Sequence, residues 1–157
     1  MSFTSRSVQR GRINMEEELP DDIYDRVSDL SERGNDLLEA GQADAAIVAW
    51  QSALALLPEP RRKWEAAMWL HASIGDAQQQ QGETEAALLS FQEAAESADG
   101  YANGFVQLGI GTCLFDLGRK AESTDHLLRA FMAEGEEIFE ESDPKYFDHL
   151  RSQKLID

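Results

Sequence analysis

The sequence contains few of the residues that build metal sites and disulfides. Its 157 residues include one cysteine, Cys113, and three histidines in separate segments of the chain. A single cysteine excludes an internal disulfide and is typical of a reducing compartment, and the histidines match no recognised spacing of metal ligands. No glycine-rich loop of the kind that cradles phosphate is present either. We therefore predict a cytoplasmic protein with no metal and no cofactor.

Basic residues are scarce as well. Fourteen lysines and arginines stand against thirty aspartates and glutamates, so the formal net charge is −16. Nucleic acids and anionic membranes require a basic binding surface, and neither is an expected partner for such an acidic chain. The charge favours a basic protein partner, and it serves equally well to keep a protein in solution.

Long hydrophobic runs are absent too. No window approaches the roughly 18 apolar residues of a membrane span, and the first residues lack the apolar core of a signal peptide. Strand-like alternation is also missing, while alanine, leucine, glutamate and glutamine dominate, which predicts an all-α fold. We expect a single domain over residues 21–157. Residues 1–20 are expected to be disordered, because Met1–Asn14 has three arginines, no acid and no hydrophobic periodicity.

What the sequence does contain is a repeated pattern of small, aromatic and proline residues. In Val27–Pro60 these landmarks fall at positions 8, 15, 20, 24, 27 and 32 of a 34-residue unit, as Gly34, Gly41, Ala46, Trp50, Ala53 and Pro58. The unit returns at Met68–Tyr101 with Gly75, Gly82, Ala87, Phe91 and Ala94. It returns again from Gly104 with Gly111, Gly118 and Ala130, although Ser123 and Leu127 replace the alanine and the aromatic residue. The pattern resembles the tetratricopeptide repeat.

The resemblance implies a right-handed superhelix of three helix-turn-helix repeats. Small residues at positions 8 and 20 let the paired helices approach closely, and glycine at position 15 suits a left-handed helix cap. We expect helices at about 21–40, 43–57, 61–81, 84–98, 103–117 and 120–140. The position-8 glycines are 41 and then 36 residues apart, and the extra residues Arg61–Ala67 are expected to lengthen the helix that follows them. Asp143 before Pro144 predicts a seventh helix that caps the last repeat.

In proteins of this family, positions 2, 5, 9, 12 and 13 of each repeat line a concave groove. The resemblance therefore places fifteen residues of this chain in the groove, and none of them is a lysine or an arginine. The predicted partner-binding set consists of Asn35, Leu38, Glu39, Trp69, Asp76, Gln79, Gln80, Phe105, Leu108, Thr112, Phe115 and Asp116. Chaperone-binding members hold a terminal carboxylate with basic groups, so the missing bases disfavour such a clamp. Aromatic residues beside acids suit instead a basic ligand with an apolar anchor, unless Trp69 packs on Trp64 or on the neighbouring repeat.

Catalysis is not expected. Cys113 and His126 are a conceivable nucleophile and base, but Cys113 falls at position 10 of its repeat, where a small residue faces the partner helix. Adjacent carboxylates such as Glu136 and Glu137 do not face each other on a helix and are assigned to a solvated surface. No convergent set of nucleophile, base and stabilising group can be assembled. We therefore predict a protein-binding module with no small-molecule substrate rather than an enzyme.

Two settings remain open for such a module. Parts of the third repeat and the tail, namely Gly109–Gly118, Arg129–Met132 and Asp143–Phe147, resemble short bacterial tetratricopeptide proteins associated with secreted polymorphic toxins. That resemblance implies an immunity protein, or antitoxin, that neutralises a basic toxin domain. We predict this first setting. As the alternative, the chain is similar in size, repeat number and acidic character to small secretion chaperones, which hold an effector or translocator segment in their groove. An adjacent toxin gene or secretion operon would separate the two settings.

Overall fold

The computed structural model describes residues 18–157, and residues 1–17, which belong to the segment expected to be disordered, lie outside the described part. Seven α-helices and two 3₁₀ turns make up the described chain, and it contains no strand. The α-helices are α2 (Asp21–Glu39), α3 (Ala43–Leu56), α4 (Glu65–Gln80), α5 (Thr84–Glu96), α6 (Gly104–Asp116), α7 (Lys120–Glu134) and α8 (Pro144–Ser152), and the 3₁₀ turns are η2 (Arg61–Lys63) and η3 (Glu136–Phe139). Within residues 18–157 no helix is both long and apolar enough to cross a membrane. The predicted all-α fold is confirmed.

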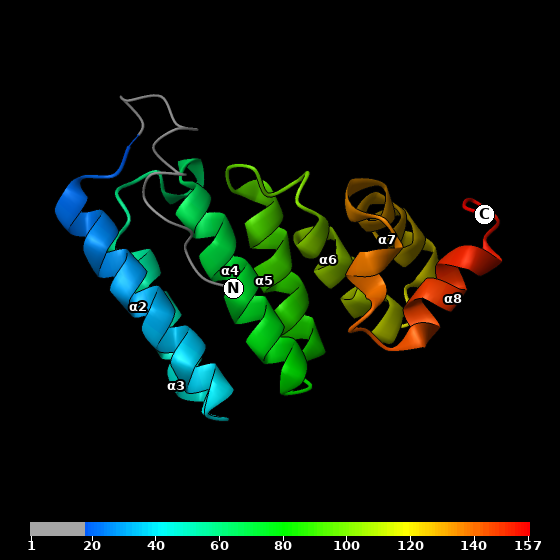
Figure 1. Ribbon diagram of the computed structural model, residues 1–157, viewed down its shortest axis with the longest axis horizontal. Coiled ribbons are helices and arrows are strands. Elements are labelled where there is room, and N and C mark those ends of the chain that lie inside the picture. The colour runs from blue at the N-terminus through cyan, green and yellow to red at the C-terminus, as the bar shows by residue number, and fades with distance from the viewer. Residues whose placement is uncertain (1–17) are drawn as a thin grey trace.

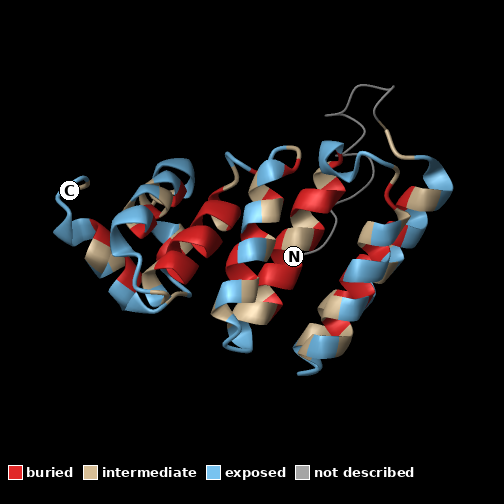
Figure 2. Ribbon diagram, turned by 180° about the vertical axis from the view of Figure 1, so that it is seen from behind, coloured by how far each residue is buried: buried red, intermediate tan, exposed pale blue. Residues whose placement is uncertain are grey.

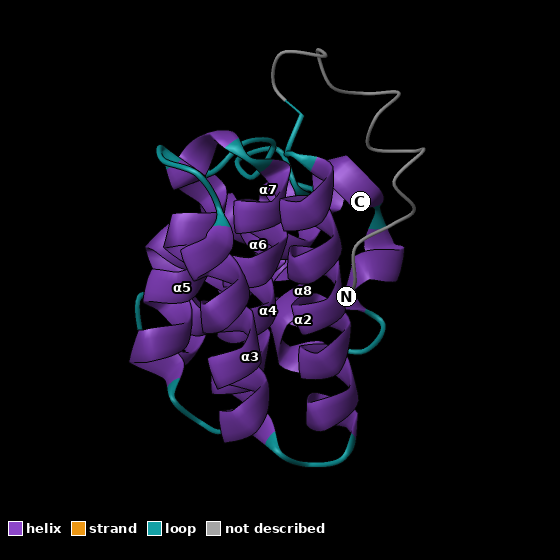
Figure 3. Ribbon diagram, turned by 90° about the vertical axis from the view of Figure 1, so that its left-hand side faces the viewer, coloured by secondary structure: helices purple, strands orange, loops and turns teal. Residues whose placement is uncertain are grey.

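Consecutive helices pack in pairs, α2 with α3, α4 with α5 and α6 with α7, and the pairs stack in chain order with α8 at the far end (Figure 1). The connections that lead into α4 and α6 lie at the same end of the stack as the start of α2, so these three helices run in one direction (Figure 1). Viewed along the stack, α3 and α5 lie toward one side and α2 toward the other (Figure 3). The most extensively buried helices are α4 and α6 (Figure 2). The fold is a right-handed superhelix of three helix-turn-helix repeats.

Within the first two pairs the helices meet at a glycine that lies against an aromatic ring. A β-carbon at Gly34 would overlap the indole of Trp50, and one at Gly75 would lie 3.0 Å from the ring of Phe91. Both rings are 1% exposed. The Trp50 indole is also held in place, because its Nε1 donates a hydrogen bond to the backbone oxygen of Ser31 at 3.1 Å. Both aromatic residues therefore belong to the core.

The third pair keeps this arrangement with different side chains. Leu127 takes the place of the aromatic residue, and a β-carbon at Gly111 would lie 2.7 Å from its Cδ2. Ser123 takes the place of the alanine, and its hydroxyl donates a buried hydrogen bond of 2.7 Å to the backbone oxygen of Gly111. A buried hydroxyl with a partner costs little stability, so serine is tolerated at this crossing.

The turn inside each pair is built on a glycine with positive φ. The φ angles are 79° at Gly41, 81° at Gly82 and 82° at Gly118, in the left-handed region that glycine adopts without steric cost. In the first turn the N–H of Gln42 reaches back to the backbone oxygen of Leu37 at 2.8 Å, which is the hydrogen bond of a Schellman cap. The predicted turns are confirmed.

The sequence predicts one helix over 61–81, lengthened at its start by the residues between the first and second repeats. This prediction is wrong, because α4 begins only at Glu65. Trp64 is extended, with φ −95° and ψ 132°, and separates η2 from α4. Its buried indole donates a hydrogen bond to the backbone oxygen of Pro58 at 2.8 Å. The backbone oxygen of Arg62 accepts a hydrogen bond from the N–H of Ala98 at 2.8 Å instead of continuing a helical ladder. Tertiary contacts therefore override the local helical preference at this junction.

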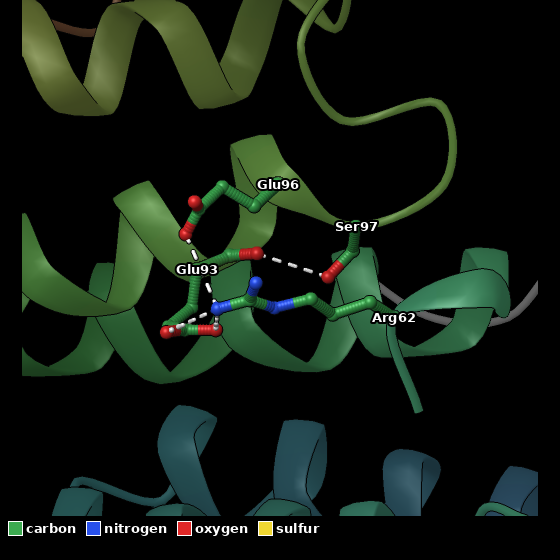
Figure 4. Close-up of polar contacts among 4 residues, drawn as sticks. All are labelled: Arg62, Glu93, Glu96 and Ser97. Atoms are coloured by element: carbon green, nitrogen blue, oxygen red, sulfur yellow. Dashed lines mark hydrogen bonds and ion pairs between the residues drawn. The ribbon is translucent and has the colours of Figure 1, made fainter. Parts of the chain in front are cut away.

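Arg62 also links the 3₁₀ turn η2 to α5 through two ion pairs (Figure 4). Its Nη2 lies 3.1 Å from the carboxylate of Glu93 and 3.3 Å from that of Glu96. Ser97 closes the end of α5 through a hydrogen bond from its hydroxyl to the backbone oxygen of Glu93 at 2.9 Å. All three charged side chains are exposed to solvent, so each ion pair contributes at most about 1 kcal/mol and serves mainly to orient the turn.

The helix predicted at 120–140 ends earlier, at Glu134. Gly135 follows with φ 79°, which stops the helix, and the chain continues into η3. This change of direction carries Phe139 into the core, where it is 6% exposed and its ring lies 5.0 Å from that of Phe147. Burial of an aromatic ring favours the broken path over a longer, exposed helix.

The C-terminal helix α8 has the predicted cap and the predicted position. The side chain of Asp143 accepts a hydrogen bond from the N–H of Lys145 at 2.9 Å, and Pro144 occupies the first helical position. Tyr146 and Leu150 are buried in the cluster that closes the third repeat. The helix therefore covers apolar surface that the last repeat would otherwise expose.

We expect Gly34→Ala to destabilise the protein and Gly75→Ala to leave its stability nearly unchanged. Alanine is favoured over glycine in a helix interior by about 1 kcal/mol at both positions. At Gly34 the new methyl group overlaps a hydrogen-bonded indole, and such overpacking costs on the order of 1–3 kcal/mol. At Gly75 the ring of Phe91 needs to shift only slightly. Chemical unfolding of both variants measures the difference, and equal free energies of unfolding would show that the first crossing has room for a side chain.

We expect Leu150→Ala to lower the free energy of unfolding by about 2–5 kcal/mol, the range for removing a fully buried leucine side chain. Leu150 is 0% exposed, whereas Leu155 is 55% exposed, so Leu155→Ala is the matched control and should change little. Ending the chain at Asp143 exposes the same cluster and should promote self-association, measured by light scattering. A shortened chain that stays monomeric and fully helical would show that α8 is not a cap.

Candidate functional site

The candidate site is the surface carried by α2, α4 and α6, which we call the inner face. The helix α4 packs directly against α6, and Gln79 on α4 donates a hydrogen bond from Nε2 to Thr112 Oγ1 on α6 at 2.8 Å. All twelve predicted contact residues lie on these three helices. Since the three helices run in one direction and α4 contacts α6, residues at the same repeat position of α4 and α6 lie side by side.

Two aromatic residues lie at one end of the inner face. Trp69 and Phe105 belong to the first turns of α4 and α6, and both are partly buried against the core of the second and third repeats. The ring of Phe105 meets that of Phe91 edge-on at 6.0 Å, and the Trp69 Nε1 lies 3.4 Å from the carboxylate of Glu65. Trp64 is buried in the cluster of the first repeat instead. Trp69 thus packs on the neighbouring repeat with one side and keeps part of its surface exposed.

Asp76 lies further along α4 and is partly buried. Burial raises the pKa of its carboxyl above the ordinary value of 3.8, because a low-dielectric environment disfavours the charged form. Gln80 opposes this shift by donating a hydrogen bond from Nε2 to the carboxylate at 3.2 Å. A partly buried carboxylate lowers the stability of the folded protein when it is ionised. Carboxylates with a raised pKa are frequent at functional sites.

The first repeat contributes a more modest surface. Leu38 packs partly against the core of that repeat, Asn35 is intermediate in burial, and Glu39 is exposed at the end of α2. Gln79 is tied to α6 through the hydrogen bond described above. These residues extend the inner face toward the far ends of the helices.

Two predicted contact residues are buried. Leu108 is 8% exposed and belongs to the cluster of the third repeat, and Thr112 is 4% exposed. The Thr112 hydroxyl also donates a hydrogen bond to the backbone oxygen of Gly109 at 3.2 Å. Their position on α6 is as predicted, but they support the face from within and offer little surface to a partner.

The helix α8 contacts two further predicted residues, Phe115 and Asp116. The ring of Phe115 lies 5.4 Å from that of Tyr146 and 5.2 Å from that of His149. The carboxylate of Asp116 accepts a hydrogen bond from the Tyr146 hydroxyl at 2.7 Å and pairs with Lys145 at 3.2 Å. Asp116 remains exposed although it has these two partners on α8, whereas Phe115 is partly buried.

Sequence reasoning missed two lysines at the end of the inner face beside α8. The ammonium groups of Lys120 and Lys145 lie 5.0 and 5.9 Å from the centre of the Phe115 ring, within the range of a cation–π contact. Neither lysine occupies one of the five groove positions, so the repeat register did not find them. The twelve predicted contact positions contain no base, but these two lysines place positive charge beside one of them.

A cavity of about 520 Å³ opens on the other side of the stack, between the first two repeats. It is lined by Gln51, Leu54, Ala55, Glu59, Pro60, Arg61, Arg62, His71 and Glu93. Arg61 and Arg62 already pair with glutamates there, and burial lowers the pKa of His71. The arginines and glutamates that line the cavity pair with one another. The lining therefore does not favour a ligand of either charge.

The chemistry of Cys113 agrees with a structural role. Its side chain is 0% exposed, and burial raises the pKa of the thiol to about 12, so the reactive thiolate does not form near neutral pH. His126 hydrogen-bonds Gln107 through Nδ1 at 2.7 Å. Between residues 18 and 157 no three His, Cys, Asp or Glu side chains are placed to hold a metal ion.

Comparison with solved structures identifies the fold. No protein-family model and no curated protein sequence matches the chain. The first tetratricopeptide domain of Spaghetti (RPAP3), bound to an HSP90 peptide, matches with a TM-score of 0.65 and 18% identity over 83% of this chain and 96% of that one. The Yersinia enterocolitica type III secretion chaperone SycD, in complex with a peptide of the translocator YopD, matches with a TM-score of 0.66 and 18% identity over 83% and 94%. MamA matches with a TM-score of 0.59 and 15% identity over 82% and 78%. The chain thus has the tetratricopeptide-repeat fold.

We expect Asp76→Asn to raise the free energy of unfolding near neutral pH. The folded pKa of Asp76 lies above its unfolded value of 3.8, so ionisation in the folded state costs stability. This deficit is absent below pH 3.8, grows as the pH rises through the folded pKa, and is constant above it. The exposed Glu85→Gln on α5 is the control. Thermal melts over a pH series test the expectation, and an Asp76→Asn variant less stable than the parent at neutral pH would contradict it.

Proposed function

We propose that this protein is a non-catalytic binding module that holds an extended, basic segment of a partner protein on its inner face. The observation that carries the proposal is the combination of Trp69, Phe105 and Asp76. Two aromatic residues with exposed surface lie on neighbouring helices, and a partly buried carboxylate lies further along one of them. An apolar anchor and a basic side chain are the groups that this arrangement can receive.

The energetics favour a cation at Asp76. A carboxylate that has lost part of its hydration gains more from an ammonium or guanidinium group than a solvated one does, because the local dielectric is lower. Trp69 and Phe105 add apolar surface to be buried and aromatic faces that attract cations. Lys120 and Lys145 lie at the other end of the inner face, beside Phe115.

The structural neighbours support a peptide ligand. Two of the solved structures with this fold contain a bound peptide, one from HSP90 and one from YopD. These peptides are ligands of the RPAP3 domain and of SycD. At 18% identity the likeness to those structures shows a common fold and does not identify the ligand of this chain. The proposal for a basic ligand therefore rests on the charge and the aromatic residues of this chain's own inner face.

Two settings fit this activity. The likeness to SycD favours a chaperone of a secretion system that holds an effector or translocator segment, and we place this setting first. The similarity of the third repeat and tail to immunity proteins favours the second, in which the protein neutralises a basic toxin domain. Both settings require the same inner-face contacts.

Binding kinetics with synthetic peptides test the proposal. The probe is a 12-residue peptide with four lysines around one leucine, and its partner probe carries glutamates in place of the lysines. We expect the basic probe to bind and the acidic one not to bind. Raising the salt concentration should mainly slow association, because exposed charges are screened beyond roughly 8 Å at physiological ionic strength.

The variants locate the site. Trp69→Ala should mainly speed dissociation of the basic probe, by about thirtyfold if the indole is an anchor worth roughly 2 kcal/mol. Asp76→Asn should weaken binding about tenfold, while Glu85→Gln on the opposite side should leave it unchanged. If both inner-face variants remain folded and bind the probe like the parent, the inner face is not the binding surface.

A further inference from the structure

We propose that the cavity between the first two repeats is a second binding site, which takes an uncharged aromatic ring that carries a hydroxyl group, a phenol. The site is separate from the inner face and does not depend on the function proposed for that face. Its walls come from α3, the connection between the first two repeats, α4 and α5. Its volume of about 520 Å³ is within the usual range of small-molecule pockets, roughly 300–1,000 Å³.

One wall of the cavity consists of residues that the repeat pattern does not require. The position-8 glycines are 41 residues apart at this junction and 36 apart at the next, and residues 59–62 of the longer connection line the cavity. Tertiary hydrogen bonds hold this connection in place. The indole of Trp64 donates to the backbone oxygen of Pro58, and the backbone oxygen of Arg62 accepts from the N–H of Ala98. The cavity is therefore a particular feature of this junction.

The charged groups of the lining favour an uncharged ligand. Arg61 Nη1 lies 3.2 Å from the carboxylate of Glu59, and Arg62 Nη2 lies 3.1 Å from that of Glu93 (Figure 4). A charged ligand would have to displace one of these partners. A guanidinium group that is paired through its N–H groups still presents a flat face, on which an aromatic ring can stack.

His71 supplies a polar contact inside the cavity. Its ring forms no hydrogen bond with any other residue in the described part of the chain. Within the same residues no side-chain nitrogen is both fully buried and unpaired, so the ring nitrogens of His71 are accessible. Burial lowers the pKa of His71, and Arg62 adds to this shift while Glu93 opposes it. The imidazole is therefore neutral near neutral pH, with one N–H donor and one acceptor nitrogen.

A phenol matches both parts of the lining. Leu54, Ala55 and Pro60 offer apolar contact to an aromatic ring. A hydroxyl group both donates and accepts hydrogen bonds, so it can pair with either nitrogen of His71. With a pKa of about 10, a phenol is also uncharged near neutral pH. A tyrosine side chain of a bound protein and a free phenolic compound both carry this group, and the experiment below distinguishes them.

NMR titration of the full chain tests the site, with the methyl resonances of Leu54 and Ala55 as reporters. The probes are N-acetyl-tyrosinamide and N-acetyl-phenylalaninamide, which differ only in the hydroxyl group. We expect the tyrosine derivative to bind with a Kd on the order of 1 mM. The phenylalanine derivative should bind about tenfold more weakly, because it leaves His71 without a partner. The rings of His126 and His149, on α7 and α8, are internal references and should not shift.

A third probe, p-cresol, separates the two sources of the phenol. If p-cresol binds as tightly as the tyrosine derivative, the ring and hydroxyl are the whole ligand, which supports a free phenolic compound. If the tyrosine derivative binds more tightly, its amide groups also make contacts, which supports a tyrosine of a bound protein.

Three variants locate the site. Ala55→Trp places a large ring in the cavity from an exposed position and should abolish binding of the tyrosine derivative. Its matched control is Val48→Trp, also at an exposed position of α3 but outside the lining, which should bind like the parent. His71→Phe keeps a ring and removes the hydrogen bond, so the tyrosine derivative should bind about tenfold more weakly. The Leu54 methyl resonances report binding in all three variants.

Three results overturn the inference. They are the absence of shifts at Leu54 and Ala55 with every probe, equal affinity for the tyrosine and phenylalanine derivatives, and binding that Ala55→Trp leaves unchanged. A thermal melt of each variant verifies that it is folded. The Ala55→Trp variant should still bind the basic 12-residue probe, because the cavity and the inner face lie on different sides of the stack. A failure of the cavity site therefore leaves the proposed function intact.

Discussion

The stack depends on how closely two paired helices approach at position 8 of each repeat. With glycine there, the ring or branched side chain at position 24 lies directly against a backbone and fills the space between the helices. Phe91 does this twice, because it contacts Gly75 in its own repeat and would also meet a β-carbon at Gly109 in the next at 2.5 Å. A single ring therefore sets both the spacing within the second repeat and its distance from the third.

This spacing produces the inner face. Helices α2, α4 and α6 run in one direction because each is the first of its pair, and each pair repeats the same crossing. The packed helices can hold a side chain whose ionised form lowers the stability of the fold. Asp76 is such a side chain, because its partial burial disfavours the charged carboxylate and raises its pKa. The hydrogen bond from Gln79 to Thr112 joins α4 and α6 on this face.

The helices, turns and caps were readable from residue types with strong local geometry. Glycine at Gly41 adopts a positive φ, and Asp143 before Pro144 opens a helix, because each conformation depends on a few adjacent residues. The two wrong predictions arose where distant contacts decide. Trp64 breaks the helix predicted from 61 because it is buried beneath the first repeat, and the chain beyond Gly135 turns because Phe139 is buried beside α8.

The candidate site divides in the same way. The sequence by itself determined which residues lie on α2, α4 and α6, since the 34-residue period assigns each position to one side of a helix. Only the tertiary structure decided which of them remain accessible. Leu108 and Thr112 share the register of an open groove, yet both are buried, and Phe115 packs against Tyr146 of α8. Periodicity encodes the direction of a side chain along its own helix, whereas accessibility depends on which segment packs above it.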